Sequence, residues 1–216
     1  MLPDLVADQI AAGEVVERPA SVVKELVENA LDARATRIGV EIRSGGKRFI
    51  SVTDNGIGMV REDTLLCTDR HATSKIRVAS DLNSISTFGF RGEALSSIAA
   101  VSRMKIWTRH KKEETGTLLR TVAGAITSIE DIARQAGTMV EVSNLFYNAP
   151  ARRKFLKAAS SESRAVSEVM HNFALANPSV AFSLTSDDRS LMEVASEGDL
   201  SSRILSLWGA SVANEL

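Results

Sequence analysis

The pattern of hydrophobic and polar residues changes its period along the chain, and each change marks a predicted element. Over 19–33 the apolar residues recur at helical spacing, and Pro19 suits a first helical turn. Apolar and polar residues then alternate over 38–42 and again at 50–52, which predicts a hairpin ending at Asp54. This order of helices and hairpins, without strict strand–helix alternation, indicates a mixed sheet with helices layered on one face.

Similar patterns predict the rest of the chain. The expected elements are a short helix over 61–68, a long polar loop over 69–88, a helix over 92–100, strands over 104–108, 117–122, 125–129 and 139–142, a helix over 162–176, a hairpin of 181–185 with 191–195, and a last helix opened by 198–199. A loop as long as 69–88 within a compact domain is usually functional.

Composition places the chain among ordinary globular proteins. It has 216 residues, of which 44% are hydrophobic and 25% charged, and its net charge is -1. This argues against a uniformly basic nucleic-acid binder, although local basic patches remain candidates for phosphate binding. The single cysteine, Cys67, cannot form an intramolecular disulfide, and neither a secretory signal nor a membrane-spanning run is visible. We therefore expect a cytoplasmic protein.

One face of the first predicted helix carries three polar residues, Glu25, Asn29 and Asp32. At about 100° per residue they fall within an arc of about 60°. The opposing apolar stripe consists of Val22, Val23, Leu26, Val27 and Ala30. A carboxylate on a packed helix suits a general base, and an amide oxygen one turn on suits Mg²⁺. Taken singly, both side chains also fit solvated positions on a helix surface.

Two glycine-containing loops follow this helix. In the first, 54–59, a carboxylate at a strand end can accept a hydrogen bond from adenine, although an ordinary turn would look similar. In the second, 89–92, glycines precede a helix whose free N–H groups favour phosphate, although a plain helix cap would look the same. The segment between them, with Thr73, Ser74 and Lys75, suits a lid over a nucleotide. Together, helix face and loops predict an ATP site.

Several longer motifs agree in identity, order and spacing with one family. They are 9–19, the run through Asp32, 54–58, 70–75, 89–95 and 146–155. On these residues the chain resembles the amino-terminal ATPase region of the MutL mismatch-repair proteins, which belong to the GHKL ATPases. The resemblance extends through about Lys157. It implies an α+β fold, a two-layer α/β sandwich of the GHKL (Bergerat) type, whose mixed, mostly antiparallel sheet carries helices on one face.

The resemblance also implies site roles. Glu25 would be the base that acts on the attacking water, Asn29 the Mg²⁺ ligand and Asp54 the adenine reader. The implied nucleotide-binding set is Asn29, Asp32, Asp54, Gly56, Gly58, Met59, Thr73, Ser74, Lys75, Gly89, Phe90, Arg91, Gly92 and Thr138. One departure concerns Arg34, which stands where the family usually has glycine, so an altered turn is expected after the helix.

For the whole chain, the resemblance implies an ATP-driven switch. Residues 1–200 would form the ATP-binding domain, with a dimerisation arm over about 1–16 and a lid over about 69–92, and 201–216 would begin a truncated second domain. ATP would close the lid and drive homodimerisation into a clamp on DNA. In the family the second domain supplies a lysine to the γ-phosphate, so we expect only weak Mg-dependent hydrolysis here.

Two basic clusters are candidates for largely sequence-independent DNA contact, with a solvated basic face as the alternative for each. They are Arg152, Arg153, Lys154 and Lys157, and Arg109, His110, Lys111 and Lys112. Mismatch-recognition and downstream repair proteins are the other implied partners. Two alternative functions remain: a nucleotide-gated dimerisation and DNA-binding module without appreciable turnover, and a histidine kinase, for which none of the three histidines has a suitable setting.

Overall fold

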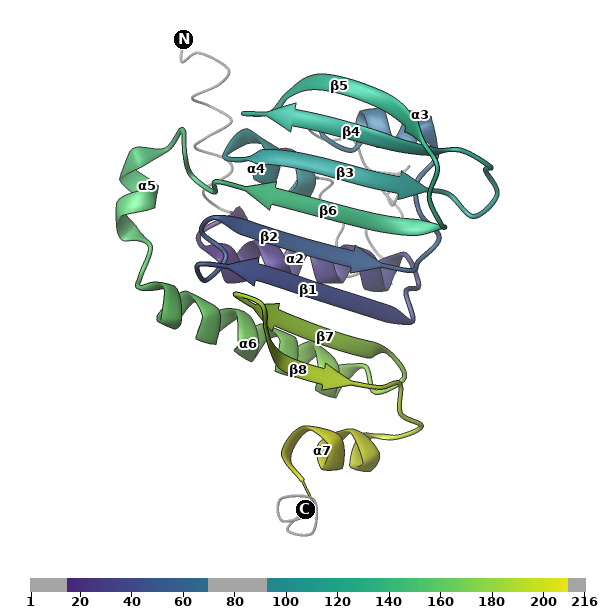
Figure 1. Ribbon diagram of the computed structural model, residues 1–216, viewed down its shortest axis with the longest axis vertical. Helices are drawn as coiled ribbons and strands as arrows, with labels where there is room; N and C mark the ends of the chain where they lie inside the picture. Colours follow the sequence, from purple (N-terminus) through teal and green to yellow (C-terminus); the bar gives the residue numbers. More distant parts are fainter. Residues whose placement is uncertain (1–14, 70–92, 210–216) are drawn as a thin grey trace, which may run out of the picture.

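The computed structural model describes residues 15–69 and 93–209 (Figure 1). Its helices are α2 (Pro19–Asp32), α3 (Arg61–Leu66), α4 (Ala94–Ala100), α5 (Pro150–Phe155), α6 (Ala159–Ala176) and α7 (Leu200–Trp208). Its strands are β1 (Arg37–Arg43), β2 (Phe49–Asp54), β3 (Arg103–Arg109), β4 (Gly116–Val122), β5 (Ala125–Ile132), β6 (Gly137–Ser143), β7 (Ala181–Ser186) and β8 (Arg189–Val194). No helix in these ranges is long and apolar enough to cross a lipid bilayer.

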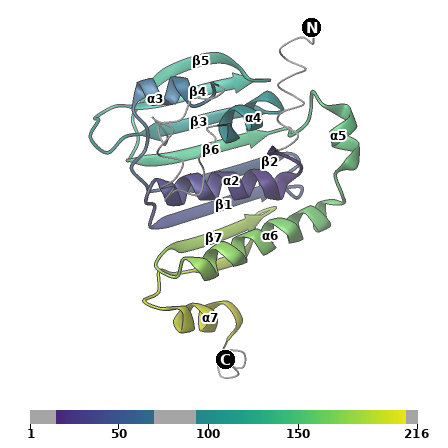
Figure 2. The same ribbon diagram turned by 180° about the vertical axis from the view of Figure 1, so that it is seen from behind.

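The strands form one sheet in the order β5-β4-β3-β6-β2-β1-β7-β8. Every neighbouring pair is antiparallel except β1 and β7, which run parallel. Helices α2, α4 and α6 lie on the same side of the sheet, as Figure 2 shows from behind. The predicted fold class, a mostly antiparallel mixed sheet with helices on one face, is confirmed.

The main core lies between α2 and the strands beneath it. Val22, Val23 and Val27 on the helix are fully buried, as the predicted apolar stripe requires. Ile38, Val40 and Ile42 on β1 are also buried, whereas Gly39 and Glu41 between them are more exposed. This alternation arises because successive side chains of a strand point to opposite faces. The packed core fixes α2, and therefore its polar face, on the sheet.

Two helical segments differ from the predictions. Helix α5 was not predicted, and α6 begins at Ala159 rather than near 162. No residue of α5 is buried, so this helix leaves no apolar period in the sequence, although Pro150 in its first turn was an available signal. In the first turn of α6 the buried residue is the acid Glu162, which a search for apolar spacing misses.

The turn after α2 shows why a glycine is expected at the position of Arg34. Arg34 has a φ of 59°, the left-handed conformation that favours glycine. Its N–H donates to the Leu31 carbonyl oxygen (2.8 Å), and the Ala35 N–H donates to that of Ala30 (3.1 Å). These two bonds form the Schellman motif that commonly ends helices. The turn is therefore made with an arginine in a strained conformation.

Replacing Arg34 by glycine is expected to raise the free energy of unfolding by about 0.5–1 kcal/mol, measured by urea denaturation. The left-handed conformation costs an L-residue roughly 1–2 kcal/mol, and the greater freedom of glycine in the unfolded chain offsets part of that gain. The control is Arg37→Gly, the same change in extended β1, which should destabilise. A loss of stability in Arg34→Gly would contradict the assigned strain.

Candidate functional site

Helix α2 places the three polar residues of the predicted site on its half-buried face. Glu25, Asn29 and Asp32 are all partly buried, and the Glu25 side chain is 24% exposed. Lys24, which the sequence reasoning did not single out, lies beside this face. Its Nζ is 3.7 Å from Glu25 Oε1 and 2.9 Å from Glu28 Oε1. The ammonium group therefore pairs mainly with Glu28, one helical turn away, and only loosely with Glu25.

Asp54 ends β2 opposite Thr138 of β6, with which it is paired in the sheet. The Gly56 N–H donates to Asp54 Oδ1 at 2.8 Å. Burial raises the pKa of the Asp54 carboxyl, while hydrogen bonds from the backbone of Gly56 and Thr138 and the charge of Arg134 oppose that rise. The result is a partly buried carboxylate oriented by backbone donors, as an adenine reader would need to be.

The loop after Asp54 is fastened to three other elements. The Ile57 N–H donates to the Ala33 carbonyl oxygen at the end of α2 (2.9 Å), and the Lys111 N–H donates to that of Ile57 (3.0 Å). The Asn55 side chain accepts from the Thr36 N–H at the start of β1 (2.9 Å). The loop is therefore held between α2, β1 and the segment after β3, and its position depends on all three.

Gly58 is required by the protein's own packing. It has a φ of 69°, and a Cβ at this position would lie 2.0 Å from the carbonyl oxygen of Arg109. The family resemblance places Gly56 and Gly58 in the nucleotide-binding set. The structure adds a separate reason for Gly58, because the loop passes directly against the end of β3.

The two ends of the predicted site are separated along α2. Asp54 and its loop lie at the C-terminal end of the helix, where Ile57 contacts Ala33. Glu25 precedes Ala33 by eight residues, which places it about 12 Å along the helix axis. Asn29 lies between them on the same face. This order suits an extended nucleotide with its base at Asp54 and its phosphates toward Glu25.

Thr108 of β3 forms hydrogen bonds with several segments at the Asp54 end of the site. The sequence reasoning did not single it out. Its Oγ1 accepts the Met59 N–H (2.9 Å), lies 3.0 Å from Thr138 Oγ1 and donates to the Gly137 carbonyl oxygen (3.3 Å). Nothing in its own sequence neighbourhood marks Thr108. Only the pairing of β3 with β6 brings it beside Thr138.

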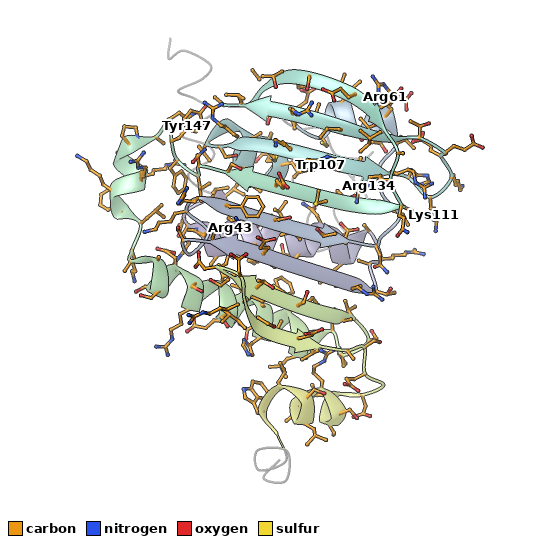
Figure 3. All side chains as sticks on the ribbon, in the orientation of Figure 1. Arg43, Arg61, Trp107, Lys111, Arg134 and Tyr147 are labelled. Carbon is orange, nitrogen blue, oxygen red and sulfur yellow. The ribbon has the colours of Figure 1, made fainter. Side chains whose placement is uncertain are left out.

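Arg134 is the second residue missed at this end. Its guanidinium donates to the Trp107 carbonyl oxygen, and its charge acts on Asp54. Figure 3 shows Arg134 and Lys111 toward the same end of the sheet. Its position contributes a positive charge beside the buried carboxylate.

Replacing Thr108 by valine is expected to lower the free energy of unfolding by about 1–3 kcal/mol, measured by urea denaturation. Valine has the same shape but leaves the partly buried Met59 N–H without its acceptor. Thr121→Val is the matched control, because Thr121 is also buried but its hydroxyl has no hydrogen-bond partner. That variant should be neutral or more stable. Equal losses in both variants would show that the Thr108 hydrogen bonds contribute little.

The rest of the predicted nucleotide set lies outside the described residues. It comprises Thr73, Ser74, Lys75, Gly89, Phe90, Arg91 and Gly92. Their assignment to a lid and a phosphate loop stays a prediction.

The amide oxygen of Asn29 is of the right chemical type for Mg²⁺, a hard ion that prefers oxygen ligands. Within the described ranges, no group of three or more His, Cys, Asp or Glu side chains is placed to hold a metal ion. Mg²⁺ commonly takes one or two protein ligands and fills its other positions with water and substrate phosphates. A single ligand on the α2 face therefore fits this ion bound together with a nucleotide.

Comparison with known proteins defines the class. The family described as "Histidine kinase-, DNA gyrase B-, and HSP90-like ATPase" matches residues 17–144, which include α2 and the loop after Asp54. The observed architecture, a sheet with helices on one face, is consistent with this family match. The chain belongs to this class of ATPases.

Relatives within the class are more specific. The chain is 52% identical over 216 residues to the DNA mismatch repair protein MutL of Acidobacterium capsulatum and 49% identical over 215 residues to that of Streptococcus pyogenes. Both alignments cover 100% of this chain but only 32% and 33% of the relatives, so the chain spans about a third of their length.

Solved structures agree with these relatives. The MutL ATPase domain of Aquifex aeolicus complexed with ADP has a TM-score of 0.72 and 38% identity, covering 89% of this chain and 69% of that one. The N-terminal domain of a DNA repair protein has a TM-score of 0.79 and 28% identity, covering 94% and 60%. Within its class, the chain belongs to the MutL family and represents its amino-terminal ATPase region.

Proposed function

We propose that this chain binds ATP and hydrolyses it slowly, as the switch domain of a MutL-type mismatch-repair protein. The observation that carries the proposal is the arrangement along α2. A partly buried, backbone-oriented carboxylate, Asp54, stands at one end, and Glu25 and Asn29 share the face that leads away from it. ADP in the Aquifex aeolicus relative supports a nucleotide as the ligand.

In this proposal each residue has one task. Asp54 accepts a hydrogen bond from the exocyclic amine of adenine, with Gly56, Gly58 and Met59 lining the base pocket and Thr138 beside it. Glu25 orients and deprotonates the attacking water. The Asn29 oxygen binds Mg²⁺, which when bound neutralises charge on the phosphates. Asp32 adds a third polar group on the same face.

The remaining parts of the switch follow from the family. ATP closes the lid over 69–92, which contributes Thr73, Ser74, Lys75 and the phosphate loop 89–92, and so drives homodimerisation through the arm over 1–16. The dimer clamps DNA, with phosphates contacted by Arg152, Arg153, Lys154 and Lys157. Mismatch-recognition and downstream repair proteins are its partners, and the bacterial cytosol is its location. A lysine from a second domain completes full activity.

Calorimetric titration with Mg-ATP and a non-hydrolysable analogue tests the binding step. We expect saturable binding, and we expect Asn29→Ala to weaken it by about tenfold with magnesium present but to match the unchanged chain in EDTA. Asn172→Ala, an exposed asparagine of α6, is the control. Absence of saturable binding by the intact chain would overturn the proposed ATP site. Unchanged Mg-ATP affinity in Asn29→Ala would remove its metal role.

A second candidate shares the binding step but lacks turnover. The chain spans about a third of its relatives' length, and the family resemblance implies that a second domain supplies a lysine to the γ-phosphate. In that case the protein is a nucleotide-gated dimerisation and DNA-binding module. The effect of replacing Glu25 separates the two candidates.

A further inference from the structure

One lysine of α2 lies within reach of two acids. Lys24 Nζ is 2.9 Å from Glu28 Oε1 and 3.7 Å from Glu25 Oε1. The Lys24 side chain is 52% exposed, whereas those of Glu25 and Glu28 are 24% and 12% exposed. A lysine carries its charge on a flexible four-carbon stem, so a half-exposed lysine can turn toward either carboxylate. The position of the ammonium group therefore depends on which acid binds it more strongly.

Glu28 is the stronger partner of Lys24. The distance to Glu28 is that of a normal charged hydrogen bond, and the distance to Glu25 is longer than one. The hydrogen bond to Glu28 is the largest cause of a raised pKa of the Lys24 ammonium, burial opposes the rise, and the contributions of Glu25 come last. The two acids thus compete for one cation, and Glu28 holds it.

Helix stability alone is a poor reason for an acid at position 28. All the other buried residues of α2 are apolar. A carboxylate at such a position destabilises the fold unless it is paired, and an apolar side chain of similar volume often serves packing as well or better. The order of the pair, with the lysine one turn before the acid, is also the less favourable one for a helix. The effect of Glu28 on the neighbouring site offers a better reason.

The position of the ammonium group matters for the acid that stands next to it in sequence. A cation in hydrogen-bond contact favours the ionised form of a carboxylate and so weakens it as a base. Glu25 is the residue to which the proposed function assigns the water's proton. If Lys24 moved from Glu28 to Glu25, the base would be weaker and one of its oxygens would be occupied by the ammonium group.

We propose that Glu28 is a positioning residue for ATP hydrolysis, because by binding Lys24 it keeps the ammonium group out of hydrogen-bond contact with Glu25 and so preserves the strength of the base. The proposal rests on the proposed role of Glu25. In that step the water oxygen bonds to the γ-phosphorus as the bond to the bridging oxygen of ADP breaks, and Glu25 takes the water's proton. Glu28 and Lys24 act on this step only through Glu25.

Phosphate release in a single turnover, with Mg-ATP affinity followed separately by calorimetry, tests the proposal. Glu28→Gln keeps the shape of the side chain but releases Lys24 to Glu25. It is expected to lower turnover by about tenfold and to change the affinity less than about twofold. Glu28→Asp keeps the charge on a shorter side chain, and its turnover should lie between those of Glu28→Gln and the unchanged chain.

A second substitution separates positioning from damage to the fold. Adding Lys24→Met to Glu28→Gln removes the released ammonium group and should recover most of the lost turnover. Damage to the fold would not be repaired by a further substitution. Glu168→Gln is the matched control, because it releases Arg164 from a pair of the same order and spacing on α6 (3.4 Å). It should leave both turnover and affinity unchanged.

Each contrary result has a separate meaning. Unchanged turnover in Glu28→Gln, with intact binding, would overturn the positioning role and leave Glu25 as the base. A loss that persists in the double variant would also overturn it, because Glu28 would then act by a route other than Lys24. If the intact chain shows no turnover, both the proposed hydrolysis and the positioning role fail, whereas the ATP site is judged by calorimetry alone.

Discussion

Replacing Glu25 by alanine is expected to lower the turnover of bound ATP by about 10²–10⁴-fold, the usual cost of losing a general base, while affinity for Mg-ATP changes little. The structure gives a reason to expect an intact fold. Glu25 is partly exposed, and Lys24, its neighbour at 3.7 Å, keeps its closer partner Glu28 at 2.9 Å. Lys24 therefore keeps its main partner in the variant.

The measurement is phosphate release in a single turnover, with binding followed separately by calorimetry. Glu168→Gln on α6 is the control, since it alters an exposed acid whose ion-pair partner is Arg164 in the same helix. Unchanged turnover with intact binding would place the base elsewhere. If the intact chain shows no turnover at all, the variant will match it, and the gated binding module becomes the better description.

The elements that the sequence predicted share one property: their buried residues are apolar and recur along the sequence at the spacing of a helix or a strand. The apolar stripe of α2 and the alternation in β1 consist of residues such as Val22, Val27, Ile38 and Ile42, which are all fully buried. Helix α5 has no buried residue and so left no such signal. The N-terminal turn of α6 was missed for a related reason, because Glu162 is buried through an ion pair rather than through apolar packing.

The same contrast holds at the candidate site. Asp54 was marked by its local motif and Thr138 by the family resemblance, and the register of β2 with β6 brings them opposite one another. Thr108 has no local motif, since its importance comes from a Met59 N–H and a Thr138 hydroxyl that are far away in sequence. Arg34 was recognised as a departure, but its left-handed backbone was visible only in the structure. Contacts between distant segments are what a single sequence does not display.

Replacing Asp54 by asparagine is expected to weaken ATP binding by about 10–100-fold. Hydrogen bonds to a charged group contribute roughly 1.5–3 kcal/mol, and each 1.4 kcal/mol corresponds to about tenfold in affinity. Inosine triphosphate, which lacks the exocyclic amine, should bind the unchanged chain more weakly than ATP does. The asparagine variant should discriminate much less between the two. Equal discrimination in both proteins would remove Asp54 from base recognition.

Stability should move in the opposite direction to affinity. Asparagine keeps an oxygen that can accept the Gly56 N–H now donated to Asp54 at 2.8 Å, but carries no charge to bury. Because burial raises the pKa of Asp54 in the folded state, the folded chain holds its proton to higher pH than the unfolded chain. The unfolding free energy of the unchanged chain therefore falls, relative to the variant, as pH rises from the ordinary aspartate pKa through the raised one.

Urea denaturation of Asp54→Asn and the unchanged chain across that acidic range measures this difference. The variant's advantage should be absent below the ordinary aspartate pKa, grow as Asp54 ionises and stay constant toward neutral pH. A variant less stable than the unchanged chain at neutral pH would mean that the Gly56, Thr138 and Arg134 interactions outweigh the burial of the charge. We expect the variant to bind ATP more weakly and to be more stable. This result would mean that the Asp54 carboxylate serves ligand binding and lowers the stability of the folded chain.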